Sequence, residues 1–390
     1  MQIGKLVQEG AITIKTGPFG TQLKASEYQE SGTPVLNVKN LGYGSVSSAK
    51  LDHVGSNTVE RLRIHLLKQG DIVFGRKGAV DRHAYIDDES DGWMQGSDCI
   101  RLRVETDDIN PRFLSYYFLT NKHKAFMVSM CSHGTTMASL NQNILEQIDF
   151  PFMEREYQDK ITGSLEIIDE KIKVNQKINE NLLQQAQSLY EHLCDNCTSS
   201  ELVSLAELMD YAGGSQPPAS EFIFEEKAGY IRFVQIRDYD TDSHITYIPE
   251  SARNKLCEEH DIMIARYGAS LGRICSGING AYNVALAKVF PKKPYYREFL
   301  RCYLSSRVFY EGINNKGGRS AQAGFNQSDI KSFELRLPSE NDLISFEEIA
   351  SSMFEHRLTL NKENRKLASL RDALLPKLMS GELDVSELDI

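Results

Sequence analysis

Two short turns carry the side chains of this sequence that are best suited to contact with a charged polymer. Gly75-Arg76-Lys77-Gly78 follows one apolar run, and Ala265-Arg266-Tyr267-Gly268 follows another. Arginine offers a two-pronged donor to guanine, both arginine and lysine offer positive charge to phosphate, and glycine lets the backbone approach a ligand closely. One such turn alone is typical of a solvated hairpin. Because the same arginine occurs at the same place twice, the pair predicts DNA contact.

A second pair of polar loops precedes an Asn-Gln dipeptide in each half of the chain. These loops are His133-Gly134-Thr135-Thr136 and Lys316-Gly317-Gly318-Arg319, and either could be a DNA-contacting loop or simply a flexible one. The candidate DNA-contacting residues of the first half are Lys39, Arg76, Lys77, Arg82, His133, Thr135 and Thr136. Those of the second half are Arg237, Arg266, Tyr267, Arg273, Lys316 and Arg319.

Other polar residues are better explained by structure than by chemistry. Asn141 and Asn326 each precede a helix-like run, where asparagine is a preferred N-cap. Cys194 and Cys197 form a lone Cys-x-x-Cys pair near His192, and without a second pair at ligand spacing they predict free thiols at a helix end rather than a metal site.

The sequence offers no catalytic site. It has no Asp/Asn-Pro-Pro-Tyr/Phe motif, no glycine-rich cofactor fingerprint after a strand and no nucleotide-hydrolase phosphate loop. Its nine histidines are scattered, and no cluster of carboxylates repeats. We therefore expect a protein without a metal or a cofactor of its own.

The elements that would position the two turns occur in duplicate. The two apolar runs begin at Asp71 and Asp261, and the later landmarks Leu140 and Phe325 are separated by nearly the same interval. Phe113-Leu114 with Tyr117 matches Phe299-Leu300 with Tyr303 at a similar offset, in segments whose apolar spacing predicts helices. The agreement of these offsets to within a few positions predicts a tandem duplication.

Each copy is followed by a segment with apolar residues at alternating spacings of three and four, the pattern of a coiled-coil seam. In the first segment the seam is Ile161, Leu165, Ile168, Ile172, Asn175, Asn179, Leu182, Ala186, Leu189 and Leu193. In the second it is Phe346, Ile349, Met353, His356, Leu360, Glu363, Leu367, Leu370 and Leu374. The asparagines of the first seam are expected to fix pairing, with His356 and Glu363 as possible partners.

These patterns predict an α+β protein with two α/β globular domains in tandem repeat and two long antiparallel coiled-coil helices, related by a pseudo-twofold axis. We expect the first domain at residues 1–153, its helix at 154–200, the second domain at 201–338 and its helix at 339–390. Helices of about 35 to 40 residues within these segments would rise roughly 50 to 60 Å, so they are expected to act as spacers.

The distribution of charge fits that division. Residues 154–200 carry 5 basic and 9 acidic side chains and residues 339–390 carry 6 and 11, so these segments hold all but one unit of the net charge of −10. The two globular segments are close to neutral and can bind DNA if their basic side chains gather on one face. The sequence lacks an apolar run of about 18 residues and a secretory N-terminus, which predicts a cytoplasmic protein without a membrane partner.

Residues 367–383, with the sequence LASLRDALLPKLMSGEL, closely resemble the ending of the DNA-specificity subunit of type I restriction-modification systems. Gly17-Pro18-Phe19-Gly20, residues 70–74, Gly134-Thr135-Thr136, Gly213-Gly214 and the helix at 169–193 are similar to other parts of that family. The resemblance implies two target-recognition domains, each reading one half of a split sequence in double-stranded DNA.

The same resemblance implies that this subunit is not itself an enzyme. Its helices would set the gap between the half-sites and dock two methyltransferase subunits, which would carry S-adenosylmethionine and methylate adenine, and motor-nuclease subunits would join them. Two alternatives stay open on the residues alone. One is a DNA-modifying or DNA-cleaving enzyme whose site is assembled from distant residues, and the other is a coiled-coil scaffold with two peptide-binding domains.

Overall fold

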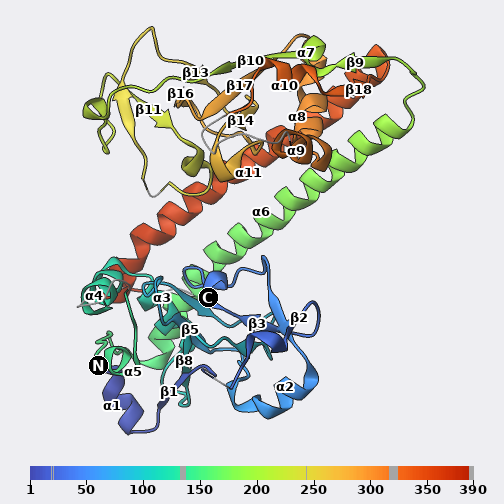
Figure 1. The fold of residues 1–390 in the computed structure, drawn as a ribbon. Helices are drawn as coiled ribbons and strands as arrows, with labels where there is room; N and C mark the ends of the chain where they lie inside the picture. Colours follow the sequence, from blue (N-terminus) through green and yellow to red (C-terminus); the bar gives the residue numbers. More distant parts are fainter. Residues whose placement is uncertain (19, 21, 132–137, 243, 316–323, 386–390) are drawn as a thin grey trace. The chain divides into compact units, whose positions relative to one another are not determined.

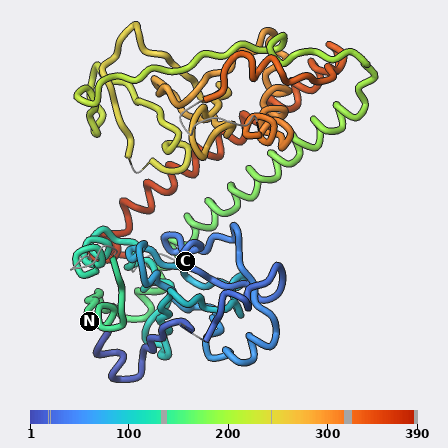
Figure 2. Tube along the Cα trace, in the orientation of Figure 1, coloured from blue at the N-terminus to red at the C-terminus, as the bar shows by residue number. Residues whose placement is uncertain are grey.

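The computed structural model describes residues 1–18, 20, 22–131, 138–242, 244–315 and 324–385. It divides into two compact units, of which unit 1 is Met1–Ile172 with Arg365–Ile390 and unit 2 is Lys173–Asn364. Figures 1 and 2 trace the chain from unit 1 into unit 2 and back into unit 1. Each unit therefore contains its own sheets and part of both long helices.

Unit 1 is built on two four-stranded sheets. The first has the order β1-β8-β5-β6, all antiparallel, with β1 at Ile12–Thr16, β8 at Cys99–Val104, β5 at Ile72–Gly75 and β6 at His83–Tyr85. Every residue of β5 is buried, as its unbroken apolar run predicts for a central strand. The second sheet has the order β2-β4-β3-β7, with β2 at Tyr28–Gln29, β4 at Asp52–Val54, β3 at Thr33–Leu36 and β7 at Met94–Gln95.

Unit 2 repeats this arrangement. Its first sheet has the order β10-β17-β14-β15, with β10 at Met209–Gly213, β17 at Leu286–Pro291, β14 at Met263–Ala265 and β15 at Ile274–Cys275. Its second has the order β12-β11-β16-β13, with β12 at Tyr247–Pro249, β11 at Tyr230–Val234, β16 at Gly280–Tyr282 and β13 at Leu256–Cys257. A two-stranded sheet adds β18 at Glu334–Arg336 to β9 at Leu202–Ser204.

The predicted duplication is confirmed by strand pairing. The antiparallel order β1-β8-β5-β6 recurs as β10-β17-β14-β15, so the strands before the two arginine turns, β5 and β14, occupy the same place. In the second sheets, β4-β3-β7 corresponds to β12-β11-β16, and both contain a parallel pair, β3 with β7 and β11 with β16. A parallel pair at the same step of two mixed sheets follows from one ancestral topology.

Short helices surround these sheets. Those of unit 1 are α1 (Ile3–Gln8), α2 (Ser56–Arg61), α3 (Pro111–Phe118), α4 (Asn121–Cys131) and α5 (Gln142–Glu146), with 3-10 turns η1 (Ala25–Glu27), η2 (Val38–Asn40) and η3 (Arg63–His65). Those of unit 2 are α7 (Leu205–Leu208), α8 (Arg297–Ser305), α9 (Arg307–Asn314) and α10 (Gln327–Lys331), with η4 (Ala219–Glu221), η5 (Ile236–Tyr239), η6 (Gly268–Ser270) and η7 (Pro294–Tyr296). The helices expected around Phe113 and Phe299 are α3 and α8.

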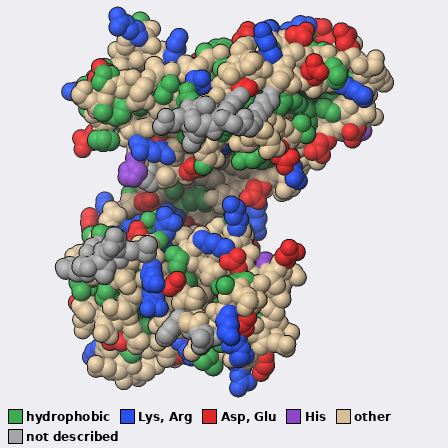
Figure 3. Space-filling model, viewed as in Figure 1, with side chains coloured by type: hydrophobic (Ala, Val, Ile, Leu, Met, Phe, Trp, Pro, Cys, Tyr) green, Lys and Arg blue, Asp and Glu red, His purple; other side chains and the backbone are tan. Residues whose placement is uncertain are grey.

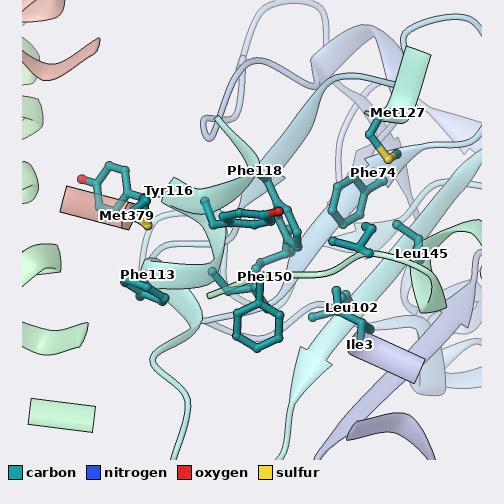
Figure 4. Close-up of a cluster of buried hydrophobic side chains, with 14 of the residues drawn as sticks. Ile3, Phe74, Leu102, Phe113, Tyr116, Phe118, Met127, Leu145, Phe150 and Met379 are labelled. Atoms are coloured by element: carbon teal, nitrogen blue, oxygen red, sulfur yellow. The ribbon is translucent and has the colours of Figure 1, made fainter. Parts of the chain in front are cut away.

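The core of unit 1 joins the sheet to these helices. Figure 4 shows Phe74 of β5 beside Phe118 of α3, and their ring centroids are 5.0 Å apart in an edge-to-face arrangement. Met379 reaches the same buried cluster from the end of the C-terminal long helix. The last turns of that helix are therefore part of the first domain's core.

The two long helices are α6 (Arg155–Asp195) and α11 (Glu340–Ser380), each 41 residues long. Asn175 donates from Nδ2 to Glu363 Oε2 and Asn364 Oδ1, at 2.9 Å each, and Asn179 Nδ2 donates to Asn361 Oδ1 at 2.9 Å. Residue numbers rise on one helix as they fall on the other, so the helices pair antiparallel within unit 2. Glu363 is one of the two partners expected for the seam asparagines, whereas the other, His356, is exposed.

The seam differs from the predicted heptads at three positions of α11, because His356 is exposed as well as Ile349 and Leu370. Ile349 and Leu370 are each 50% exposed. The first half of α11 instead buries residues at spacings of three and four that turn toward the core of unit 2, namely Leu343, Phe346, Ala350, Phe354 and Leu358. The domain core, rather than a strict coiled-coil repeat, sets the buried face of this helix, and Ile349 lies off it. The seam residues of α6 are buried or half-buried, as are Met353, Leu360, Leu367 and Leu374 of α11.

Among the described residues, no helix combines the length and the apolar character that crossing a membrane requires.

Candidate nucleic-acid interface

The arginine turn of unit 1 is fixed between two other segments. The amide of Arg76 donates to the carbonyl of Asp98 at 2.8 Å, and the carbonyl of Arg76 accepts from the amide of Leu140 at 2.8 Å. Gly78, with a φ of 77° that favours glycine, donates from its amide to the carbonyl of Ala138 at 3.0 Å. The turn is therefore held beside Ala138 and Leu140, which follow the second polar loop along the chain.

Lys77 lies on the outside of this turn. Its ammonium is 3.8 Å from Asp98 Oδ1, and its side chain is 55% exposed. A single long contact between exposed groups holds a lysine only weakly, so Lys77 can exchange this partner for a phosphate.

Lys39 occupies the 3-10 turn η2. Its ammonium contacts Asp52 Oδ2 at 2.7 Å, and the hydrogen bond from Lys39 lowers the pKa of the Asp52 carboxyl. Both side chains are partly exposed, at 48% and 38%. The charge of Lys39 is thus compensated by a neighbouring strand.

Arg82 stands at the far end of the same hairpin, beside an exposed aromatic ring. Its guanidinium carbon lies 5.6 Å from the centroid of Tyr43, and the Lys124 ammonium of α4 lies 4.6 Å from the same centroid. The Tyr43 hydroxyl donates to Asp81 Oδ2 at 2.8 Å. Tyr43 and Lys124 were not predicted from the sequence, because they come from two other elements that only the fold brings to Arg82.

Two buried histidines lie near the cluster of Arg82, Tyr43 and Lys124, but neither adds positive charge to it. His83 bonds through Nε2 to Ser115 Oγ at 2.9 Å, and burial lowers the pKa of His83 to about 3. Burial likewise lowers the pKa of His123 to about 3. Both imidazoles are therefore neutral near pH 7, and the positive charge belongs to Arg82 and Lys124.

The arginine turn of unit 2 is packed more tightly. The amide of Arg266 donates to the carbonyl of Ala285 at 2.8 Å, and its guanidinium carbon lies 5.2 Å from the Tyr267 ring and 5.8 Å from the Phe325 ring. A Cβ on Gly213 would collide with Arg266 Nη1. Gly213 is thus needed because the guanidinium lies against its backbone, and Arg266 is only partly exposed.

The polar loop of unit 2 also ends at this turn. A Cβ on Gly324, which follows that loop, would lie 2.7 Å from the carbonyl oxygen of Arg266 and 2.6 Å from the ring of Tyr267. The chain therefore passes directly over both residues.

The other two predicted basic residues with described positions in unit 2, Arg237 and Arg273, both contact Asp240. Arg273 donates from Nη1 and Nη2 to the two carboxylate oxygens of Asp240, at 2.9 and 2.6 Å. Arg237 is exposed, its nearest acidic atom being Asp238 Oδ1 at 3.9 Å, and its carbonyl accepts from the amide of Asp240 at 3.0 Å. Arg273 is therefore neutralised whereas Arg237 is free to contact a ligand.

Five predicted residues lie outside the described part of the chain: His133, Thr135, Thr136, Lys316 and Arg319. On the face drawn in Figure 3, basic and acidic side chains are interspersed on both units. On this face, DNA contact would therefore depend on local clusters of basic side chains rather than on a surface of a single sign.

The two asparagines assigned to structure are confirmed as N-caps. Asn141 Oδ1 accepts from the amide of Ile144 at 3.0 Å at the start of α5. Asn326 Oδ1 accepts from the amides of Ser328 and Asp329, at 2.9 and 3.1 Å, at the start of α10. Cys194 and Cys197 are free thiols, and burial raises the pKa of Cys194. Within the described ranges, no three His, Cys, Asp or Glu side chains gather as a metal site would require.

Comparison with known proteins agrees with the duplicated fold. The family described as the type I restriction modification DNA specificity domain matches residues 12–184. The MjaIX type I restriction enzyme specificity subunit of Methanocaldococcus jannaschii is 25% identical, over 73% of this chain and 72% of that protein. The HindI specificity subunit of Haemophilus influenzae is 20% identical, over 89% and 94%.

A solved structure shares the fold. The S subunit of the type I restriction-modification system from M. genitalium aligns with a TM-score of 0.56 and 16% identity, over 97% of this chain and 95% of that chain. The fold of this chain is therefore one that a type I restriction-modification S subunit also has. Residues 12–184 thus match the DNA specificity domain of these systems, and the chain over most of its length is similar to type I restriction enzyme specificity subunits.

Proposed function

We propose that this chain reads a bipartite DNA target with one half-site for each unit, without catalysing a reaction itself. The observation that carries the proposal is the repetition of one local structure. In each unit a buried strand, β5 or β14, ends in an arginine turn, and residues that follow the second polar loop in the sequence lie against that turn. The two copies share one local structure but carry different side chains, so each copy could recognise a different half-site.

The long helices would serve protein partners rather than DNA. Together with their flanking residues they hold nearly all of the chain's net negative charge, which disfavours close approach to phosphate. Several large apolar side chains of α6 are nevertheless uncovered: Ile167 is 61% exposed, Val174 47% and Leu183 46%. Exposed apolar residues on an otherwise acidic helix are typical of a protein-docking surface.

We infer that the partners are two methyltransferase subunits and a motor-nuclease subunit, assembled in the cytoplasm. S-adenosylmethionine would be bound by the methyltransferase partners rather than by this chain. This chain would supply DNA recognition and the docking surfaces.

The decisive experiment combines the purified chain with its methyltransferase partner. Transfer of radiolabelled methyl groups from S-adenosylmethionine to duplex DNA is expected only when both proteins are present, and DNA affinity should fall steeply with salt. Methylation or cleavage of DNA by this chain alone would overturn the proposal. So would a chain that binds no duplex at low salt, with or without its partner.

A further inference from the structure

Arg82 and Arg273 occupy equivalent places in the two units but have different partners. Each lies where the hairpin after the arginine turn leads into its next strand, β6 or β15, and each faces the loop that follows a 3-10 turn, η2 or η5. In unit 1 that loop presents Tyr43, an exposed ring, and in unit 2 it presents Asp240, a carboxylate. One arginine therefore keeps its charge and the other has it neutralised.

The corner of unit 1 gathers two cations on one ring. Arg82 and Lys124 lie 5.6 and 4.6 Å from the centroid of Tyr43, which is 46% exposed. Neither cation forms an ion pair within the described residues, and the nearby carboxylate of Asp81 accepts the Tyr43 hydroxyl. An aromatic face orients a cation without cancelling its charge, so the corner stays positive and its N–H donors stay available.

The corner of unit 2 lacks both features. Arg273 gives both terminal nitrogens to Asp240, and a bidentate pair of this kind leaves it little charge or donor capacity. The offset that relates Phe113 to Phe299 puts Tyr310 at the position of Lys124, and Tyr310 approaches the same hairpin at Gly272. The second cation of unit 1 thus has no counterpart there.

We propose that Arg82 and Lys124, held on Tyr43, form a DNA-phosphate clamp in unit 1, and that Arg273 makes no such contact in unit 2. The inference rests on the proposed function, because the clamp has a role only if unit 1 meets DNA. It adds Tyr43 and Lys124 to the interface and removes Arg273 from it. Because unit 1 would make two phosphate contacts that unit 2 lacks, unit 1 would bind the DNA backbone more strongly.

The test is the salt dependence of binding to a fluorescein-labelled duplex of mixed sequence, measured by anisotropy with the full chain. Arg82→Gln and Lys124→Gln should each flatten the plot of log affinity against log salt by about 0.9. Arg273→Gln is the matched control and should keep the wild-type slope. Arg82→Lys preserves the charge and should restore most of the slope lost in Arg82→Gln.

Melting temperatures of all variants should stay near wild type, because Arg82 is exposed and Lys124 only half-buried. Wild-type slopes in both Arg82→Gln and Lys124→Gln would overturn the clamp while leaving the proposed function intact. An equal loss in Arg273→Gln would overturn the difference between the units. If the wild-type chain itself shows no salt-dependent binding, the proposed function fails first.

Discussion

Arg273 is bound by Asp240 through two hydrogen bonds, 2.9 Å from Nη1 to Oδ2 and 2.6 Å from Nη2 to Oδ1. The hydrogen bond from Arg273 lowers the pKa of the Asp240 carboxyl, and Asp240 in turn raises the pKa of Arg273. Both groups stay charged across the neutral range. The pair therefore removes one arginine from a hairpin whose counterpart in unit 1 leaves Arg82 charged and exposed.

Releasing Arg273 should strengthen DNA binding. Asp240→Asn removes the charge that holds the guanidinium, so the slope of log affinity against log salt is expected to steepen by up to about 0.9, the value for one added phosphate contact. The double variant Arg273→Gln with Asp240→Asn separates this effect from the loss of a negative charge. If the gain persists in the double variant, it does not come from Arg273.

The two adjacent glycines of unit 2 should respond differently to alanine. A Cβ on Gly213 would meet only the flexible end of Arg266, whereas one on Gly214 would meet the backbone carbonyls of Tyr282 and Asn283. Gly213→Ala should therefore displace Arg266 and weaken DNA binding with little change in melting temperature, to about the level of Arg266→Gln. Gly214→Ala should lower the melting temperature itself, because neither carbonyl can move without disturbing the strands.

Unchanged DNA affinity in Gly213→Ala and Arg266→Gln would show that this arginine packs the loop without touching DNA. Its contacts with Tyr267 and Phe325 would then be its whole role.

Asp71, the landmark that begins β5, should matter chiefly for stability. Its side chain is fully buried, and its oxygens accept from Arg103 Nε at 2.6 Å and Nη2 at 2.7 Å. Asp71→Asn weakens a buried pair and is expected to cost about 3 kcal/mol of unfolding free energy. The equivalent Asp261 is 21% exposed and pairs with Lys288 at 2.6 Å, so Asp261→Asn should cost about 1 kcal/mol.

Urea titration of the two variants followed by circular dichroism checks this difference, because Asp261 lies in unit 2, which has no tryptophan. Trp93, the single tryptophan of the chain, packs at the edge of a core cluster of unit 1 and reports unfolding of that unit by fluorescence. Equal losses in the two variants would contradict the role assigned to burial.

The sequence predicts the duplication because the same local causes act in both copies. Buried apolar runs become β5 and β14, and Asn141 and Asn326 become N-caps because each side chain reaches amides only two or three residues away. Such relations are readable from spacing. Partners brought from distant segments are not, and Asp240 reaches Arg273 from 33 residues away.

The long helices illustrate the same limit. Heptad spacing locates α6 and α11 and offers Glu363 as a partner for the seam asparagines, of which Asn175 bonds to it. It places Ile349 in the seam, yet that side chain is half exposed, because the face of α11 that is buried follows the core of unit 2 instead. Which cations stay free to bind DNA depends equally on tertiary partners, so charge spacing alone could not separate Arg82 from Arg273.

Unit 1 should lose stability on mild acidification, because His83 and His123 are buried in their neutral forms. Burial lowers the pKa of each from 6.5 to about 3, so between these values the unfolded chain binds protons that the folded chain does not. Stability is then complete above pH 6.5 and falls with decreasing pH toward 3, by about 1.4 kcal/mol per pH unit for each histidine.

His123→Phe should remove one of these two contributions. The imidazole of His123 lies 4.6 Å from the ring of Phe118, in a pocket that a phenyl ring can fill, and its Nδ1 has no hydrogen-bond partner to lose. Urea unfolding followed through Trp93 between pH 6 and 4 should give a slope that is shallower by about 1.4 kcal/mol per pH unit than in wild type. His356→Gln, at an exposed position of α11, is the control and should leave the slope unchanged. A wild-type slope in His123→Phe would mean that this imidazole already gains its proton in the folded chain, through an opening of α4 that hydrogen exchange at its amides would reveal.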